Sequence, residues 1–185
     1  MKIDLSAANW DDLKIVGDRL VLSPLKTQHV SKAYETWLND AAVNEFLETR
    51  WEIQTASTIE RYVERISKSK NEILLKIEIL ATGRHIGNMK IGPIDINHRS
   101  SELSYFIGEK IEWGKGFATE AIQVCTSFGF SELGLHKFQA GCYSKNIGSQ
   151  KALLKAGFHL EGRLEKRILD SKGEWQDHLW FGKLQ

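Results

Sequence analysis

The chain of 185 residues has the length of one ordinary domain, and its 42% hydrophobic and 26% charged residues predict a normal globular core. A formal net charge of +1, with Lys and Arg scattered among Asp and Glu, gives no electrostatic reason to expect a nucleic-acid partner. No apolar run is long enough to span a bilayer, the first residues lack the apolar stretch of a signal peptide, and the two cysteines are isolated, so we expect a reduced, cytoplasmic protein without membrane contact.

The first half of the chain is predicted to hold two helices and three strands. Residues 1–18 are expected to form an N-terminal arm with a short helix near Trp10–Leu13, and residues 19–25 a strand that Pro24 stops. Thr27 is expected to cap a helix, because apolar residues follow it at helical spacing. That apolar stripe consists of Val30, Ala33, Tyr34, Trp37 and Leu38. The further elements are a helix from Thr55, strands at 72–80 and 85–91 around a turn at 81–84, and a polar loop at 93–100.

The centre of the chain combines a strand, a glycine-rich turn and a helix. The strand is Glu102–Gly108, and the helix is expected from Thr119 to about residue 133, with Thr119 as its cap. Gly114 and Gly116 leave the backbone free to take a positive φ and to come close to a ligand. Free N–H groups at such a junction bind phosphate oxygens. The residues therefore predict a phosphate-binding loop.

The C-terminal part is predicted to add three strands and one helix. A strand is expected at 137–143, a helix at 146–156 closed by Gly157, and a final hairpin of strands at 158–168 and 178–184. No linker or repeat interrupts the chain. Residues 1–185 are therefore predicted to form one α/β (α+β) domain, with a mixed, mostly antiparallel sheet flanked by helices.

Two common phosphate motifs do not fit the glycine-rich turn. A P-loop would need glycine where Trp113 stands and Ser or Thr after Lys115, and a dinucleotide-binding fingerprint would need glycine at Thr119. The turn instead resembles the pyrophosphate loop of the GNAT N-acetyltransferases, Gln/Arg-x-x-Gly-x-Gly/Ala. The matching residues are Trp113-Gly114-Lys115-Gly116-Phe117-Ala118. Trp113 takes the Gln/Arg place, a departure that is familiar in the branch that resembles the RimJ/RimL ribosomal-protein acetyltransferases.

A second block, Tyr143–Phe158, also resembles the GNAT family. Asn146, Ser149 and the closing Gly157-Phe158 match the family form, in which the asparagine lies beside the pantetheine arm. Many members carry a tyrosine four residues before that glycine as the general acid, but Leu153 stands there. The RimJ/RimL branch has a serine at the position of Ser149, and the resemblance carries the acid role to it.

The resemblance implies an acyltransferase that moves the acetyl group of acetyl-CoA directly to a primary amine and releases CoA. In this family two parallel strands splay apart beside the thioester, and a backbone N–H of the Phe106–Gly108 region is the expected donor to its oxygen. Glu102 is the first candidate for the base, and Ser149 for the donor to the departing sulfur, although a surface role and a packing role stay open for them. The residues expected to bind the cofactor are Phe106, Ile107, Gly108, Trp113, Gly114, Lys115, Gly116, Phe117, Ala118, Thr119, Asn146 and Ser149.

The sequence does not identify the amine acceptor. In the family, the helices before the first long hairpin wall the acceptor cleft, which makes Trp37, Glu45, Glu48, Arg50 and Trp51 the candidate contacts. A protein N-terminal amine is the first candidate acceptor, and a nucleotide-linked amino sugar or another small amine is the second. Because the usual tyrosine is missing, a non-catalytic acyl-CoA-binding regulatory module is the alternative of a different class. No histidine spacing predicts a metal site, and both a monomer and a homodimer fit the sequence.

Overall fold

A computed structural model describes residues 10–185 of the chain. The strands are β1 (Ile15–Val16), β2 (Leu20–Pro24), β3 (Ile73–Ile79), β4 (His85–Asp95), β5 (Ser100–Ile107), β6 (Lys137–Tyr143), β7 (His159–Leu169) and β8 (Trp175–Leu184). The helices are α1 (Lys32–Asn39), α2 (Ala41–Asn44), α3 (Ala56–Ser67), α4 (Phe117–Ser131) and α5 (Ile147–Lys155), with 3-10 turns η1 (Thr27–His29), η2 (Glu48–Trp51) and η3 (Lys110–Glu112).

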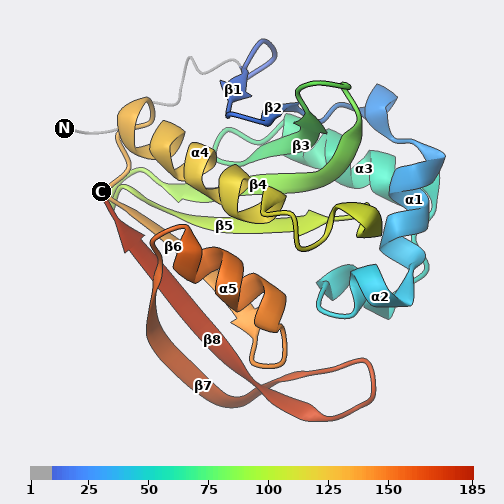
Figure 1. The fold of residues 1–185 in the computed structure, drawn as a ribbon, viewed down its shortest axis with the longest axis vertical. Helices are drawn as coiled ribbons and strands as arrows, with labels where there is room; N and C mark the ends of the chain where they lie inside the picture. The colour runs from blue at the N-terminus through green and yellow to red at the C-terminus, as the bar shows by residue number, and fades with distance from the viewer. Residues whose placement is uncertain (1–9) are drawn as a thin grey trace.

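The strands form one eight-stranded sheet in the order β1-β2-β3-β4-β5-β6-β8-β7 (Figure 1). Neighbouring strands are antiparallel except β5 and β6, which are parallel. The sheet of the described residues therefore has the mixed, mostly antiparallel character that the sequence predicted.

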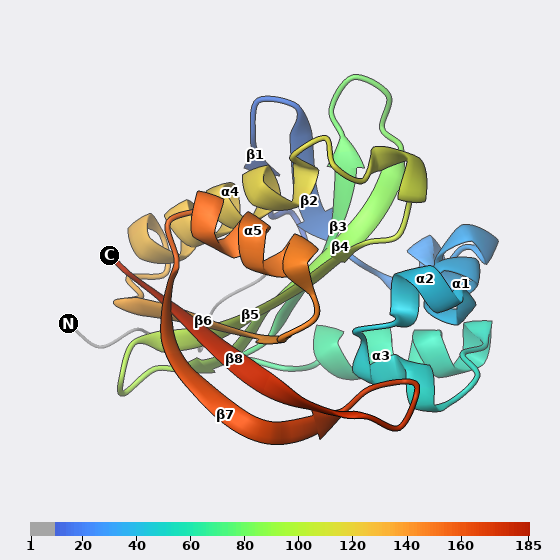
Figure 2. The same cartoon turned by 60° about the horizontal axis from the view of Figure 1, so that its bottom comes forward.

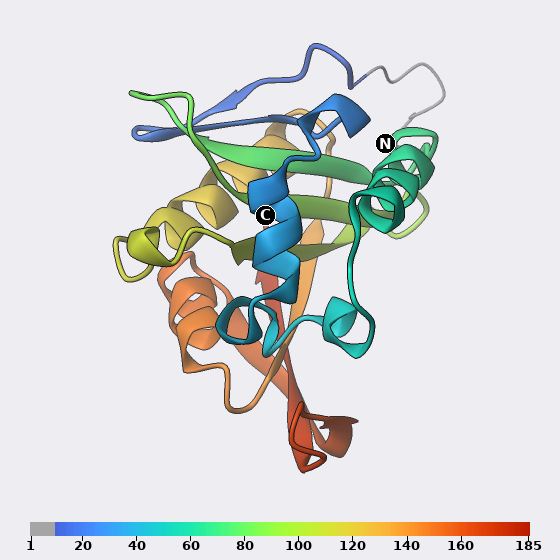
Figure 3. The same ribbon diagram turned by 90° about the vertical axis from the view of Figure 1, so that its right-hand side faces the viewer.

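Helices cover both faces of the sheet. Alternate residues of a strand point to opposite faces, so Leu75 belongs to the core under α4 and α5 whereas Leu74 belongs to the core under α1 and α3. Figure 3 shows α4 and α5 on one side of the sheet and α3 on the other. The sheet thus separates two hydrophobic clusters, and its central strands contribute to both.

One predicted helix and two predicted boundaries were wrong for local reasons. No helix forms at Trp10–Leu13, where a turn is closed by the Leu13 N–H on the Trp10 carbonyl (3.0 Å) and β1 follows. Thr27 begins only the turn η1, because Ser31 caps α1 by accepting the Tyr34 N–H on its Oγ (3.2 Å). Strand β4 continues to Asp95 through part of the predicted loop. Its register with β5 shifts between Ile91 and Ile94, which accommodates a proline that has no N–H to donate.

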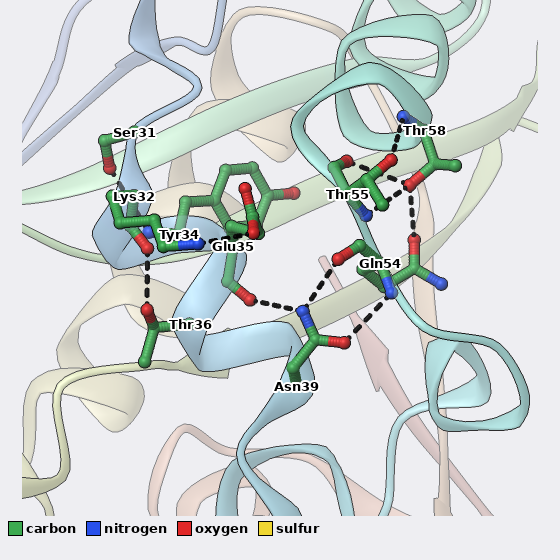
Figure 4. Close-up of polar contacts among 9 residues, drawn as sticks. All are labelled: Ser31, Lys32, Tyr34, Glu35, Thr36, Asn39, Gln54, Thr55 and Thr58. Atoms are coloured by element: carbon green, nitrogen blue, oxygen red, sulfur yellow. Dashed lines mark hydrogen bonds and ion pairs between the residues drawn. The ribbon is translucent and has the colours of Figure 1, made fainter.

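A reciprocal contact joins the end of α1 to the start of α3. The Asn39 amide donates to the Gln54 carbonyl (2.8 Å), and the Gln54 N–H donates to the Asn39 side-chain oxygen (2.9 Å) (Figure 4). Thr55 caps α3 in the predicted way, with its Oγ1 accepting the Thr58 N–H. Residues 40–53, which contain α2 and η2, therefore form a segment whose two ends are fixed, and this segment carries most of the predicted acceptor contacts.

Candidate active site

Strands β5 and β6 separate soon after they begin to pair. Residues 100–102 of β5 pair with 137–139 of β6, and no pairing follows although β5 continues to Ile107 and β6 to Tyr143. Figure 1 shows the two strands running apart from this region. This confirms the predicted splayed strands, and it leaves backbone groups of β5 without a β6 partner.

The end of β5 directs one backbone N–H toward the gap. The Gly108 N–H donates to the Ile86 carbonyl on β4 (2.8 Å). Because N–H groups alternate along a strand, the Phe106 N–H lies on the same side and the Ile107 N–H lies on the β6 side. Within the predicted group, Ile107 is therefore the residue whose N–H faces the gap. The Trp113 indole N–H donates to the carbonyl of Ile107 (2.8 Å) and so holds the glycine loop against this strand end.

The glycine loop leads directly into α4. The helix begins at Phe117, so the prediction that Thr119 caps it was wrong. Gly116 is the N-cap with φ 86°, and Gly114 has φ 76°; this left-handed backbone, which glycine adopts without a steric penalty, starts the helix early. The first N–H groups of a helix have no intrahelical partner, and no side chain caps α4. These N–H groups are therefore suited to phosphate oxygens.

Arg19, which the sequence analysis did not select, lies against this loop from the start of β2. Its guanidinium donates to the Lys115 carbonyl (2.9 Å) and to Glu120 (2.8 Å), and it lies 4.7 Å from the centre of the Phe117 ring. A Cβ at Gly116 would lie 3.4 Å from an Arg19 nitrogen. Arg19 therefore fixes the loop shape and brings a positive charge to it.

The first turn of α5 brings Ser149 to the gap. The Asn146 side chain accepts the Ser149 N–H (3.0 Å), which makes Asn146 the N-cap of α5. The Ser149 Oγ lies 2.9 Å from the Tyr105 hydroxyl on β5. Leu153 is fully buried in the core, so this helix offers no tyrosine at the usual position.

The face of the gap that lies away from α4 and α5 carries a carboxylate and an imidazole. Glu102, the last β5 residue that pairs with β6, is exposed there. His178 lies over Gly141, where a Cβ would be only 2.3 Å from the His178 Nε2. Burial, reinforced by the charge of Arg167, lowers the pKa of His178 although Glu48 and Glu102 oppose this effect. The imidazole is therefore neutral at neutral pH.

A polar network closes the far end of this face. Tyr143 donates to the carboxylate of Glu48 and accepts from Arg50, whose guanidinium also donates to the carbonyls of Leu47 (2.7 Å) and Leu169 (2.6 Å). Burial, together with the hydrogen bond to Glu48, raises the pKa of Tyr143 to about 12. The network ties the loop after α2 to the tip of the β7–β8 hairpin, and Figure 2 shows that tip beside this segment.

The predicted acceptor contacts have different surroundings. Trp37 is a core residue, 5% exposed, whose indole N–H donates to Glu109 (2.9 Å). Glu45 is partly buried, and the side chain of Arg50 is 3% exposed with both terminal nitrogens already hydrogen-bonded. Glu48 and Trp51 are exposed side by side, with the Trp51 indole N–H donating to Glu48 (3.2 Å). These two are therefore the predicted contacts most accessible to an acceptor, while the roles of all five stay predictions.

Comparison with known proteins agrees with this arrangement of loop and strands. The profile of the acetyltransferase (GNAT) domain matches residues 19–159. The chain belongs to the GNAT acetyltransferase family. It is 31% identical over 150 residues to the uncharacterized N-acetyltransferase YoaA of Bacillus subtilis, covering 80% of this chain and 84% of that protein. It is 36% identical over 121 residues to the probable N-acetyltransferase YjcK of the same organism, covering 65% of each.

The solved structures extend the likeness of fold. The ribosomal L7/L12 α-N-protein acetyltransferase RimL, solved with coenzyme A, superposes with a TM-score of 0.83 over 93% of this chain and 98% of its own at 16% identity. As a GNAT N-acetyltransferase, the present protein uses acetyl-CoA as its acetyl donor and acts on an amine acceptor. Within residues 10–185, no helix has the length and apolar character needed to cross a membrane.

Proposed function

We propose that this GNAT enzyme transfers the acetyl group of acetyl-CoA to the α-amine at the N-terminus of a protein. The observation that supports the site is the separation of β5 and β6 beside the glycine loop. We infer that the loop from Gly114 to Thr119 binds the pyrophosphate, that the Ile107 N–H donates to the thioester oxygen, and that Asn146 lies beside the pantetheine arm.

The reaction is a direct transfer in one site. The amine nitrogen, once it has lost a proton, attacks the thioester carbon, the carbon–sulfur bond breaks, and its electron pair goes to the sulfur. Glu102 takes the proton from the amine, and Ser149 gives a proton to the departing thiolate. One of the two protons lost by the ammonium thus balances the CoA thiol, and the other goes to solvent.

The bases on the face of the gap that carries Glu102 and His178, which we call the acceptor face, favour an α-amine over a lysine side chain. An α-amine has a pKa of about 7.7–8.0 and is about one third neutral near pH 7.5, whereas a lysine amine with a pKa of about 10.4 is neutral in about one molecule in a thousand. The groups on this face are the exposed Glu102 carboxylate and the neutral His178 imidazole. Such groups suffice for an acceptor that is already substantially deprotonated.

A nucleotide-linked amino sugar is the second candidate acceptor. The exposed indole of Trp51 offers a surface on which a base can stack, and the adjacent Glu48 carboxylate can hold an ammonium group. Arg50 does not favour this candidate, because its two terminal nitrogens already donate to Tyr143 and two backbone carbonyls rather than facing a phosphate.

An acceptor screen tests the proposal. CoA release from acetyl-CoA is measured with a peptide that has a free N-terminus and internal lysine, with the same peptide blocked at its N-terminus, with spermidine, and with nucleotide-linked amino sugars. We expect turnover of the free peptide and none of the blocked one. Turnover of an amino sugar alone would contradict the protein N-terminus as acceptor and favour the nucleotide-linked amino sugar. Binding of acetyl-CoA without turnover of any amine would favour a non-catalytic acyl-CoA-binding module.

A further inference from the structure

A tyrosine from the strand opposite α5 contacts the side chain that we assign to the leaving sulfur. The Tyr105 hydroxyl lies 2.9 Å from Ser149 Oγ and 3.3 Å from the Ser149 carbonyl oxygen. Tyr105 stands on β5 beyond the last residue that pairs with β6. When the Tyr105 proton points to Ser149 Oγ, the Ser149 proton is free to point elsewhere.

Ser149 also touches the second of the two separated strands. Its hydroxyl is close enough to the thiol of Cys142 on β6 to act against the rise in the pKa of that thiol. The Cys142 side chain is 5% exposed, and burial raises the pKa of this thiol to about 11, so it stays protonated and is no competing thiolate. The Ser149 hydroxyl therefore lies between a side chain of β5 and a side chain of β6, where the strands have come apart.

Other tyrosines do not supply this contact. The chain has four tyrosines, all within residues 10–185. Tyr34 is buried in the cluster under α1 and α3, Tyr62 lies 40% exposed on α3, and Tyr143 binds Glu48 and Arg50. The phenol at Ser149 is thus that of Tyr105.

We propose that Tyr105 is a positioning residue that aims the Ser149 proton at the departing CoA sulfur, an inference that rests on the proposed function. As the carbon–sulfur bond breaks and its electron pair goes to the sulfur, the Ser149 proton moves to the sulfur. The Tyr105 O–H donates to Ser149 Oγ throughout and stabilises the negative charge that develops there. A proton that the amine has released restores the Ser149 hydroxyl through solvent, so the step is balanced.

Two features suit Tyr105 to the positioning role and Ser149 to the role of proton donor. Burial raises the pKa of Tyr105 despite the hydrogen bond to Ser149, so the phenol keeps its proton at neutral pH. Ser149 is the third residue of α5, near the positive end of the helix dipole, which favours negative charge on its oxygen and on a nearby thiolate. The arrangement gives the chain a tyrosine–serine pair in place of the single tyrosine that Leu153 replaces.

A double-mutant cycle tests the proposal. Tyr105→Phe, Ser149→Ala and the double variant are compared by kcat and by KM for acetyl-CoA. CoA release is followed with the best acceptor from the screen, or with water as acceptor if no amine is turned over. We expect Tyr105→Phe to lower kcat about tenfold with an intact Ser149 and by less than about twofold in the Ser149→Ala background, because Tyr105 acts through Ser149. KM for acetyl-CoA should change by less than about twofold in both single variants.

The control and the contrary outcomes separate this inference from the proposed function. Tyr62→Phe also removes a tyrosine hydroxyl, on the outer side of α3, and should leave kcat unchanged. An equal loss from Tyr105→Phe in both backgrounds would show a merely structural role, and an unchanged kcat in Tyr105→Phe would overturn the positioning role. Full activity in Ser149→Ala would remove the pair from the mechanism while acetyl transfer itself stands. A wild-type protein that binds acetyl-CoA but releases no CoA would instead contradict the proposed function.

Discussion

Glu102 occupies the position at which β5 stops pairing with β6, and its side chain is exposed on the acceptor face. Its neighbours on the strand, Ser101 and Leu103, point into the opposite core and are 3% exposed each. Strand alternation alone therefore places the Glu102 side chain on this face, because no hydrogen bond or ion pair among the described residues engages its carboxylate. A carboxylate that is fixed by its backbone and free at its oxygens is available to an incoming amine.

Replacement of this carboxylate tests its role as the base. We expect Glu102→Gln to lower kcat/KM for the amine about a hundredfold, because the amide keeps the shape of the side chain but cannot accept the proton. The measurement is the initial rate of CoA release at several amine concentrations. Glu165→Gln, a change at another exposed glutamate on β7, should leave the rate within about twofold of wild type. A Glu102→Gln enzyme with the wild-type rate would leave His178 as the base to test.

At the scale of the element, the strand, the glycine loop and α4 act as one unit. Trp113 holds the loop to β5 through the Ile107 carbonyl, and Arg19 holds it to the start of α4 through Lys115 and Glu120. The loop is thus fixed at both ends before any ligand arrives. Such preorganisation lowers the entropy that binding must otherwise cost.

A matched pair of glycine substitutions tests the loop. Gly114 (φ 76°) and Gly83 (φ 65°) both have left-handed backbones, and a Cβ at either would meet nothing within 4 Å. Gly114→Ala and Gly83→Ala should therefore each cost about 1–2 kcal/mol of stability, by chemical denaturation. We expect only Gly114→Ala to raise the Kd for acetyl-CoA, about tenfold by calorimetry, because the new methyl group would lie where we propose that phosphate oxygens approach. Equal Kd values for the two variants would contradict the loop assignment.

At the scale of the whole molecule, the end of β5 packs into both hydrophobic clusters, one on each face of the sheet. Phe106 packs into the cluster of α1 and α3, while Tyr105 and Ile107 pack into the cluster of α4 and α5. Gly108 lies against the Trp37 indole, and a Cβ there would be 2.2 Å from a ring carbon. The position of α1 is therefore coupled to the position of the strand end that carries the Ile107 N–H.

Filling this contact should disturb both stability and the site. We expect Gly108→Ala to lower the free energy of unfolding by about 1–3 kcal/mol, since the added methyl group overlaps a packed indole. It should also weaken acetyl-CoA binding, because the end of β5 must shift to relieve the overlap. Gly162→Ala adds a methyl group where no atom lies within 4 Å and is the control. Wild-type stability in Gly108→Ala, measured by urea unfolding, would contradict the coupling of α1 to the strand end.

The sequence by itself determined the glycine loop, the strands on either side of the gap, the helix starts at Thr55 and Asn146, and the family. These signals are local, because a positive φ, a cap or a periodic apolar stripe is written in residues that are close along the chain. Local signals also misplaced the starts of α1 and α4, where Ser31 and Gly116 prevailed over the predicted threonines.

Only the tertiary structure decided which distant side chains meet at the site. Arg19 reaches the carbonyl of Lys115 across 96 positions, Tyr143 reaches Glu48 across 95, and Tyr105 reaches Ser149 across 44. No spacing rule connects residues so far apart, because their contact depends on how β5 and β6 diverge and on where the helices and the C-terminal hairpin pack around them.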